Sequence, residues 1–157
     1  MKATIELSND SPGCWTPDKQ RIATWMEPIL ELTDTREPCT ISLRFVDETA
    51  GAALNEQYRG KPGATNVLSF PAVAPTAMVR HLGRRPLGDI VICPPVVQRE
   101  AGAQGKEPAA HWAHLLQHGL LHLLGYDHAN RAGAEEMESL EIQGLERLGI
   151  KNPYLVA

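Results

Sequence analysis

The segment HGLLHLLGYDH, residues 118–128, carries three histidines at spacings of four and six residues. On a helix, His118 and His122 share one face and lie about 6 Å apart along the axis. Gly125 can end that helix, because glycine accepts the left-handed backbone conformation that is common just past a helix end. His128 can then return toward the first two histidines, so the spacing predicts that three imidazoles bind one metal ion.

Zinc is the metal that this predicted ligand set favours. Imidazole nitrogens bind zinc at about 2.0–2.1 Å, and a catalytic zinc site with three protein ligands keeps its fourth position open to water. A purely structural zinc usually has a fourth protein ligand, which Asp127 could supply, although a carboxylate beside a ligand commonly orients an imidazole or faces solvent. Histidines without any metal are the remaining alternative. The prediction is one Zn²⁺ per chain, held by His118, His122 and His128.

The frame H-x3-H-x2-G-x2-H matches a large class of zinc proteases, but their general base is missing here. Those enzymes have a glutamate directly after the first histidine, where this chain has Gly119. Zinc can still lower the pKa of bound water to about 7, and it can polarise a phosphoryl oxygen as a Lewis acid. Both effects suit cleavage of a phosphodiester, whose nonbridging oxygens gain negative charge. The sequence therefore disfavours a protease and favours a phosphodiesterase.

Phosphodiester cleavage calls for a cation beside the metal, and two basic residues are placed for that role. Arg59 and Lys61 lie where a predicted helix gives way to a loop ahead of a strand. An arginine can hold a phosphate through two parallel hydrogen bonds. The alternative for Arg59 is an exposed arginine that complements the dipole of the helix end. We predict Arg59 as a catalytic and substrate-binding residue and Lys61 as a substrate-binding residue.

A second group of basic residues lies in a predicted loop, residues 72–86. A protein of net charge −4 has no general attraction for nucleic acid, so RNA binding needs a local basic patch. Arg84 and Arg85 are predicted to bind substrate as part of such a patch, and a mobile surface loop is the alternative. The basic residues of this loop are Arg80, His81, Arg84 and Arg85.

His114 lies one helical turn before the first predicted ligand. His114 and His122 are two turns apart, about 12 Å along the axis, so they cannot easily bind the same ion. We place His114 behind the ligands or in the wall of the substrate site and count it as a candidate catalytic residue. His81 and His111 lack comparable spacing and are expected to be exposed surface residues.

Length and composition are typical of one soluble globular domain. The chain has 157 residues, of which 43% are hydrophobic and 22% are charged. Its first residues, MKATIELSND, lack the apolar segment of a signal peptide, and no window reaches the length of a membrane span. The three cysteines have no C-x-x-C spacing and are expected as free thiols in a reducing compartment. We therefore expect a cytoplasmic protein without membrane association.

Hydrophobic periodicity and turn residues predict an α+β fold. Strands are expected at 3–7, 40–46, 65–71 and 87–93, the last ended by Pro94 and Pro95. Helices are expected from Thr16 and Pro17 with a kink or an interruption at Pro28, from Asp47 to Arg59 and Gly60, from Pro108 to Gly125, and from Asn130 to Gly149. In the last helix the residues at helical spacing are Met137, Leu140, Glu141, Leu145 and Leu148.

These elements predict a single domain over residues 1–157. We expect a mixed sheet of about four strands packed with helices, because strands in the first half are followed by helices in the second. The zinc site is expected on a helix of the C-terminal half and on the loop that follows it.

Three segments of the chain together resemble the YbeY family of endoribonucleases, the bacterial rRNA maturation factors. The segments occur in the order found in the family, and the last of them is highly specific. They are LNEQYRGKPGATNVLSFP (54–71), LGDIVIC (87–93) and HWAHLLQHGLLHLLGYDH (111–128).

This resemblance implies a zinc-dependent endoribonuclease, specific for single strands, that acts in 16S rRNA 3′-end maturation and ribosome quality control. The metal ligands of the family correspond to His118, His122 and His128, and its basic residue in YRGK corresponds to Arg59. His114 falls at a position that is frequently histidine in the family, which implies a role in or near the cleft. The implied partners are single-stranded RNA or rRNA and the small ribosomal subunit or its assembly factors.

A second hypothesis comes from a different functional class. The protein would be a ribosome-associated assembly factor whose zinc is mainly structural and whose RNA cleavage is weak or incidental. This hypothesis is motivated by the missing general base and by the absence of a strongly basic composition. Asn66 stands where many members of the family have aspartate, so no carboxylate base is available there. The nucleophile, hydroxide on zinc or the 2′-hydroxyl of the substrate, stays open at this point.

Overall fold

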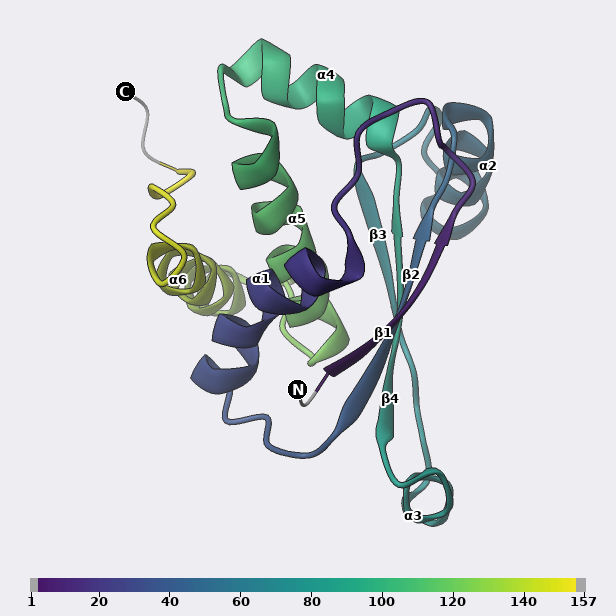
Figure 1. Cartoon of the computed structure of the whole chain (residues 1–157), viewed down its shortest axis with the longest axis vertical. Coiled ribbons are helices and arrows are strands. Elements are labelled where there is room, and N and C mark those ends of the chain that lie inside the picture. The colour runs from purple at the N-terminus through teal and green to yellow at the C-terminus, as the bar shows by residue number, and fades with distance from the viewer. Residues whose placement is uncertain (1–2, 155–157) are drawn as a thin grey trace.

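The predicted sheet is present, with helices stacked on one of its faces (Figure 1). The computed structural model describes residues 3–154. Within that range the elements are β1 (Ala3–Asn9), α1 (Lys19–Leu32), β2 (Cys39–Phe45), α2 (Glu48–Arg59), β3 (Val67–Pro71), α3 (Thr76–Leu82), β4 (Arg85–Ile92), α4 (Pro94–Gln104), α5 (Pro108–Leu123) and α6 (Arg131–Glu146). None of these helices is long and apolar enough to cross a lipid bilayer. The mixed sheet of four strands with its helices confirms the predicted α+β class.

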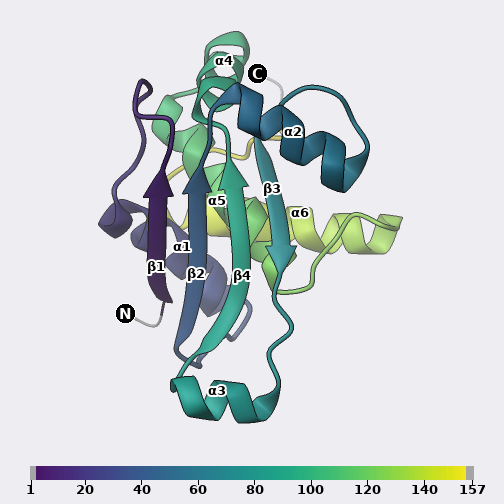
Figure 2. The same ribbon diagram turned by 90° about the vertical axis from the view of Figure 1, so that its right-hand side faces the viewer.

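The sheet has the strand order β1-β2-β4-β3. Strands β1, β2 and β4 run parallel, and β3 runs antiparallel to β4 at one edge (Figure 2). The register pairs Val67 with Ile92 and Pro71 with Gly88. Proline is compatible with the end of an edge strand, where one side of the backbone lacks a partner strand. Strand β3 also contacts α5, so this edge of the sheet lies against the helix that carries the predicted ligands.

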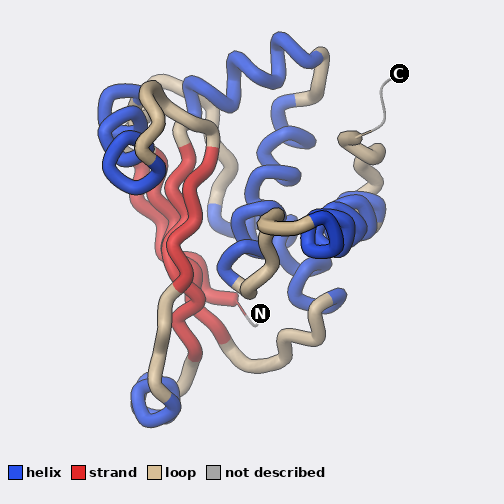
Figure 3. The backbone as a smooth tube through the Cα atoms, turned by 180° about the vertical axis from the view of Figure 1, so that it is seen from behind, coloured by secondary structure: helices blue, strands red, loops and turns tan. Residues whose placement is uncertain are grey.

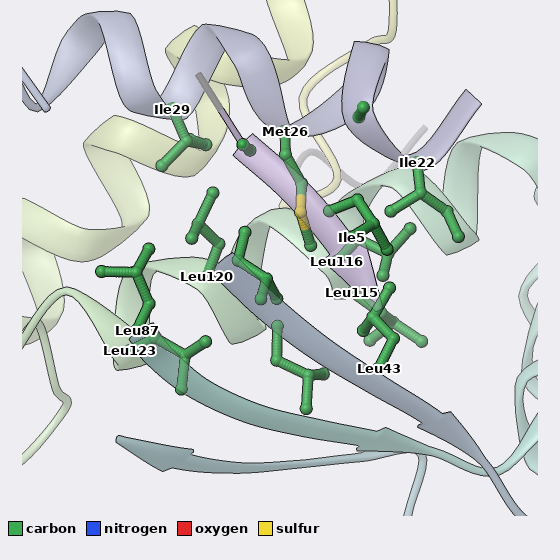
Figure 4. Close-up of a cluster of buried hydrophobic side chains, with 14 of the residues drawn as sticks. Ile5, Ile22, Met26, Ile29, Leu43, Leu87, Leu115, Leu116, Leu120 and Leu123 are labelled. Carbon is green, nitrogen blue, oxygen red and sulfur yellow. The ribbon is translucent and has the colours of Figure 1, made fainter. Parts of the chain in front are cut away.

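One face of the sheet is covered by α1 and α5, and α6 lies outside both helices (Figures 1 and 3). Along β2, Ile41, Leu43 and Phe45 are buried on this face, whereas Arg44 is exposed on the other. This alternation is expected for a sheet with one buried and one solvated face. The core between sheet and helices includes Ile5, Ile22, Met26, Ile29, Leu43, Leu87, Leu115, Leu116, Leu120 and Leu123 (Figure 4).

Helix α5 lies at the centre of this core. Trp112 packs edge-on against Phe45 of β2, with ring centroids 5.1 Å apart. At Gly119 the helix approaches the sheet so closely that a Cβ would lie 3.2 Å from side-chain atoms of Ile90 and Ser69. Gln117 is fully buried and donates a hydrogen bond to the backbone carbonyl of Trp25 in α1 at 2.9 Å. Packing on several sides therefore determines where α5 places its histidines.

The predicted boundaries of α2 and the predicted start of α6 are confirmed, whereas α6 ends at Glu146, before the end expected at Gly149. The Asp47 carboxylate accepts a hydrogen bond from the Ala50 backbone N–H at 2.8 Å, and Gly60 ends α2 with φ 66°. The Asn130 side chain accepts a hydrogen bond from the backbone N–H of Gly133 at 2.7 Å at the start of α6. Local capping residues thus suffice to locate these helix boundaries.

The prediction for the first helix is wrong in its starting residue. Helix α1 begins at Lys19, because the Asp18 side chain accepts the hydrogen bond of the Arg21 backbone N–H at 2.8 Å. The helix is not interrupted at Pro28, where a kink or an interruption was expected from the missing backbone donor. Ile29, which follows the proline, is fully buried, so packing of this face offsets the lost hydrogen bond.

Helices α3 and α4 do not appear in the predicted set. Pro94 and Pro95 end β4 as expected, but they also begin α4, since proline is tolerated in the first turn of a helix. Helix α3 lies within the predicted loop and has no buried residue, so no apolar periodicity marks it. It extends beyond the end of the sheet (Figure 2).

His111 is buried, which contradicts its expected exposed position. Its Nε2 lies 3.0 Å from Glu100 Oε1, and the same carboxylate oxygen accepts a hydrogen bond from Asn66 Nδ2 at 2.9 Å. These contacts connect α5, α4 and the start of β3. Burial lowers the pKa of His111, and the hydrogen bond with Glu100 offsets this only in part. His111 therefore favours the neutral form in the folded protein.

The pH dependence of unfolding tests the burial of His111. Because its pKa is lower in the folded state, the unfolded chain binds more protons below about pH 6.5, and stability falls as the pH decreases. We expect His111→Gln to lose less unfolding free energy between pH 7 and 5 than the unsubstituted protein. His81→Gln, at an exposed site on α3, should retain the original slope. Urea unfolding between pH 7 and 5 measures the free energy of unfolding of the unsubstituted protein and both variants. The same dependence on pH in all three proteins would contradict the prediction.

Replacement of Gly144 by alanine tests the packing of α6. A Cβ at Gly144 would lie 2.6 Å from Gln117 Oε1 and 2.7 Å from Ile29 Cδ1. We expect Gly144→Ala to lower the free energy of unfolding by about 1–3 kcal/mol, since an overpacked core must displace its neighbours. Gly102→Ala is the matched control in α4, because its Cβ meets nothing within 4 Å and alanine favours a helix by roughly 0.5–1 kcal/mol. Denaturant unfolding should therefore show a lower free energy of unfolding for Gly144→Ala and a higher one for Gly102→Ala.

Candidate metal centre and active-site cleft

The three predicted ligands converge. His118 and His122 lie on α5 and His128 lies in the loop after it, and their potential ligand atoms are all within 4.8 Å of one another. The Nε2 atoms of His118 and His122 are 3.1 Å apart. Two nitrogens that bind one tetrahedral zinc at about 2.0–2.1 Å would lie roughly 3.3 Å from each other. The donor set and its spacing therefore fit a zinc ion.

The turn after α5 brings His128 back to the helix. Gly125 adopts φ 100°, and the Tyr126 backbone N–H donates to the Leu121 carbonyl at 3.0 Å. The ring of His128 stacks on that of His118 with centroids 5.2 Å apart. The expected role of Gly125 is confirmed, since few other residues adopt this backbone conformation without strain.

Asp127 does not join the ligand cluster. Its Oδ1 accepts a hydrogen bond from the backbone N–H of Ala129 at 2.9 Å. Among residues 3–154, the only cluster of potential metal ligands is the histidine trio. Three protein ligands are the number found in catalytic zinc sites.

A buried carboxylate lies behind the first ligand. Glu141 of α6 has no exposed surface, and its Oε1 lies 2.9 Å from His118 Nδ1. Burial alone would raise the pKa of Glu141, but hydrogen bonds from His114, His118 and Tyr154 outweigh it and hold the pKa far below its usual range. As an ionised carboxylate, Glu141 accepts the Nδ1 proton of His118 in a hydrogen bond and leaves Nε2 directed at the metal position.

The second ligand is also suited to metal binding. Burial lowers the pKa of His122, and the nearby His118 and His128 lower it further. A neutral imidazole is the form that coordinates a metal ion. His122 therefore needs little deprotonation near neutral pH.

A hollow of about 490 Å³ lies in front of the three histidines, and we call it the active-site cleft. Arg59, at the end of α2, lines the cleft together with residues 67–70 of β3. Tyr58 is 57% exposed and packs edge-on against Phe70, with ring centroids 4.9 Å apart. The fold thus brings the predicted arginine and the predicted ligands, which are distant in sequence, to one cleft.

The other predicted substrate-binding residues lie elsewhere. Lys61 is exposed just after α2 but does not line the cleft. Arg84 forms a hydrogen bond with Thr4 of β1, and Arg85 Nε lies 3.4 Å from Glu37 Oε2 ahead of β2. Both arginines are therefore directed toward the β1 side of the sheet, away from the edge strand β3.

His114 lines a second hollow, of about 260 Å³, instead of the active-site cleft. The two hollows share Val67 and His118, so they lie on either side of that ligand. The second hollow is lined by Asn66, Val67, Glu100, Gln104, Lys106, His111, His114, Leu115, His118 and Tyr154. The fold thus places His114 next to the first ligand but outside the space shared with Arg59.

Glu141 and Tyr154 are site residues that motif reasoning misses. A sequence signal existed for Glu141, because an acidic residue interrupts the apolar repeat of α6 at a position that must face the core. Tyr154 carries no comparable signal, since its contact depends on the path of the chain after α6.

Comparisons with known proteins point to one family. Residues 8–149 match the model of a family described as endoribonuclease YbeY. An endoribonuclease YbeY from Xanthomonas axonopodis pv. citri is 55% identical over 154 residues, which cover 98% of this chain and 94% of that protein. A relative of the same name from Methylococcus capsulatus is 51% identical over 138 residues, which cover 88% of this chain and 87% of the relative.

A solved structure shares the fold at lower sequence similarity. The solution structure of a Thermotoga maritima protein aligns with a TM-score of 0.56 and 20% identity, and covers 98% of this chain and 100% of that one. The family model and the close relatives each extend over most of the sequence. On these grounds the chain belongs to the endoribonuclease YbeY family.

Proposed function

We propose that this protein is a zinc-dependent endoribonuclease that cleaves single-stranded RNA in the cytoplasm. The observation that carries the proposal is a single cleft with three converging imidazoles and an arginine. Membership of the family supports RNA as the substrate. Its cellular task would be 16S rRNA 3′-end maturation and ribosome quality control, with the small ribosomal subunit or its assembly factors as partners.

His118, His122 and His128 would hold the zinc ion. Imidazole ligands suit zinc, and their spacing in this cleft matches its coordination distances. When bound, zinc supplies Lewis acidity that polarises a phosphoryl oxygen and activates water at neutral pH. Glu141 keeps His118 in the tautomer that this binding requires.

Arg59 would bind the scissile phosphate. Its guanidinium can donate two parallel hydrogen bonds to nonbridging oxygens, and its charge stabilises the negative charge that develops on them. The residue lies in the last turn of α2 and lines the cleft together with the α5 histidines. Lys61, two residues further on, would extend the positive charge along the approach to the cleft.

Two aromatic rings that line the cleft support specificity for single strands. Tyr58 and Phe70 present ring surfaces beside Arg59. Unpaired bases can stack on such rings, whereas bases within a duplex are already stacked on each other. The role predicted for Arg84 and Arg85 gains no support from the cleft, so the proposed RNA contacts are those near Arg59.

A second candidate function is an assembly factor whose zinc is mainly structural. One observation favours it: among the described residues that line the cleft, none is a carboxylate that could serve as a general base. In this alternative the cleft would bind RNA with little cleavage. The two functions make different predictions when the metal or one of its ligands is removed.

Metal removal provides the test of the proposed function. We expect the purified protein to contain close to one zinc per chain, and to lose cleavage of a single-stranded RNA on chelation and regain it when zinc returns. Mass spectrometry measures the metal, and gel analysis of labelled RNA measures cleavage. Products with a 2′,3′-cyclic phosphate would identify the 2′-hydroxyl as nucleophile. Cleavage that persists in the metal-free protein would contradict the proposal.

Loss of one ligand separates the two candidates. The enzyme function requires that His118→Ala abolish cleavage while the fold is largely retained. A structural zinc would instead give a clear fall in thermal stability, because zinc binding then contributes folding free energy. Circular dichroism melting with and without zinc distinguishes these outcomes.

Substitution of Arg59 tests its contact with the phosphate. We expect Arg59→Ala to lower kcat by about 100-fold or more, the usual loss when a group that stabilises transition-state charge is removed. Arg59→Lys should restore only part of the rate, because an ammonium group cannot form the paired hydrogen bonds. Arg36→Ala, at an exposed arginine paired with Asp34, is the control and should leave cleavage unchanged. Equal rates for the Arg59 variants and the control would contradict the assignment.

A further inference from the structure

The carboxylate of Glu141 has three hydrogen-bond donors around it and no contact with solvent. Its Oε1 lies 2.9 Å from His118 Nδ1. Its Oε2 lies 2.6 Å from His114 Nε2 and accepts a second hydrogen bond from the Tyr154 hydroxyl. A buried charge is costly unless such donors compensate it, so this arrangement accounts for its burial.

The two oxygens of this carboxylate have different roles. One oxygen contacts a predicted metal ligand, and the other contacts two residues that are not ligands. A carboxylate held at only one oxygen could rotate about its χ angles. Because His114 and Tyr154 hold Oε2, Oε1 stays at His118.

Tyr154 comes from the segment that follows α6. Its backbone N–H donates to Asn152 Oδ1 at 2.8 Å, and its ring lies edge-on to that of His114 with centroids 5.7 Å apart. The tyrosine is 43% exposed, so its hydroxyl reaches the buried carboxylate from the surface. Within the described chain, a surface segment is therefore connected to the metal centre by one hydroxyl group.

We propose that Glu141 is a positioning residue for the ligand His118, and that Tyr154 and His114 hold it in place, so that the segment after α6 sets the affinity of the centre for its metal. This inference rests on the proposed function, because it assumes that the histidine trio binds zinc. Carboxylates that accept the second N–H of a ligating histidine fix the ring orientation and raise the basicity of the ligand nitrogen. His114, which lies outside the cleft, then acts on the reaction only through Glu141.

The test compares zinc affinity in the full chain, measured by competition with a chromophoric chelator. We expect Glu141→Gln to weaken zinc binding by roughly 10–100-fold, as is usual when such a partner of a ligand is lost. Tyr154→Phe keeps the ring and removes only the hydroxyl, and it should weaken binding by a smaller factor, about 3–10-fold. Glu136→Gln is the matched control, since it removes the same charge from an exposed site on α6.

Tyr154→Leu separates the hydroxyl from the packing of the ring. If the hydroxyl is what matters, the Phe and Leu variants should lose zinc affinity to a similar extent. Normal affinity in Tyr154→Phe with reduced affinity in Tyr154→Leu would assign the effect to packing and overturn the proposal. Affinities equal to that of the control in both Glu141→Gln and Tyr154→Phe would also overturn it. Failure of the unsubstituted protein to bind zinc would instead refute the proposed function.

Cleavage kinetics provide a second readout that a merely structural role would not alter. With zinc below saturation, the Tyr154→Phe variant should show a lower kcat and an unchanged KM for RNA, because fewer molecules carry the metal while Arg59 is intact. Saturating zinc should restore most of its rate. A rate that stays low at saturating zinc would contradict control of metal affinity by this hydroxyl.

Discussion

Helix α5 must bury one surface against the sheet and hold two imidazoles at the margin of that contact. Its apolar side chains fill the core between the strands and α1. Strand β3 lies beside it as an edge strand, and α6 covers its outer side and brings Glu141 behind His118. Two of the predicted ligands thus lie on α5, whose position is determined by packing. This favours a metal centre that is already arranged before the metal binds.

The same close packing explains the glycine where zinc proteases have their catalytic glutamate. The Cβ of a residue at position 119 would be 3.2 Å from Ile90 and Ser69, in the contact between helix and sheet. A longer side chain would have to displace that contact. In place of a base from α5, the cleft receives a cation, Arg59, from α2. The contact between α5 and the sheet therefore leaves little room for a glutamate at position 119.

Local patterns predict the parts of the site that depend on local geometry. The spacing of the histidines predicts that these three side chains converge, and Asp47 and Gly60 locate the ends of α2 and so place Arg59 in its last turn. Tertiary contacts are harder to predict. Glu141 is buried because α6 packs against α5, and its local sequence does not show this packing. Pro94 and Pro95 begin α4, but in the sequence they indicate only the end of a strand, because proline is compatible with a strand end and with the first turn of a helix. Helix α3 lacks a buried face, so nothing in its sequence distinguishes it from a loop.

The order of the site residues along the chain has a consequence for synthesis. Arg59 is made first, the histidines of α5 follow, and Glu141 and Tyr154 come after them. A growing chain that already contains the arginine and the imidazoles still lacks the carboxylate that contacts His118 and the hydroxyl that contacts this carboxylate. Because translation delivers the chain from its N-terminal side, the metal centre is completed late. The complete set of contacts around His118 can therefore form only after translation has passed residue 154.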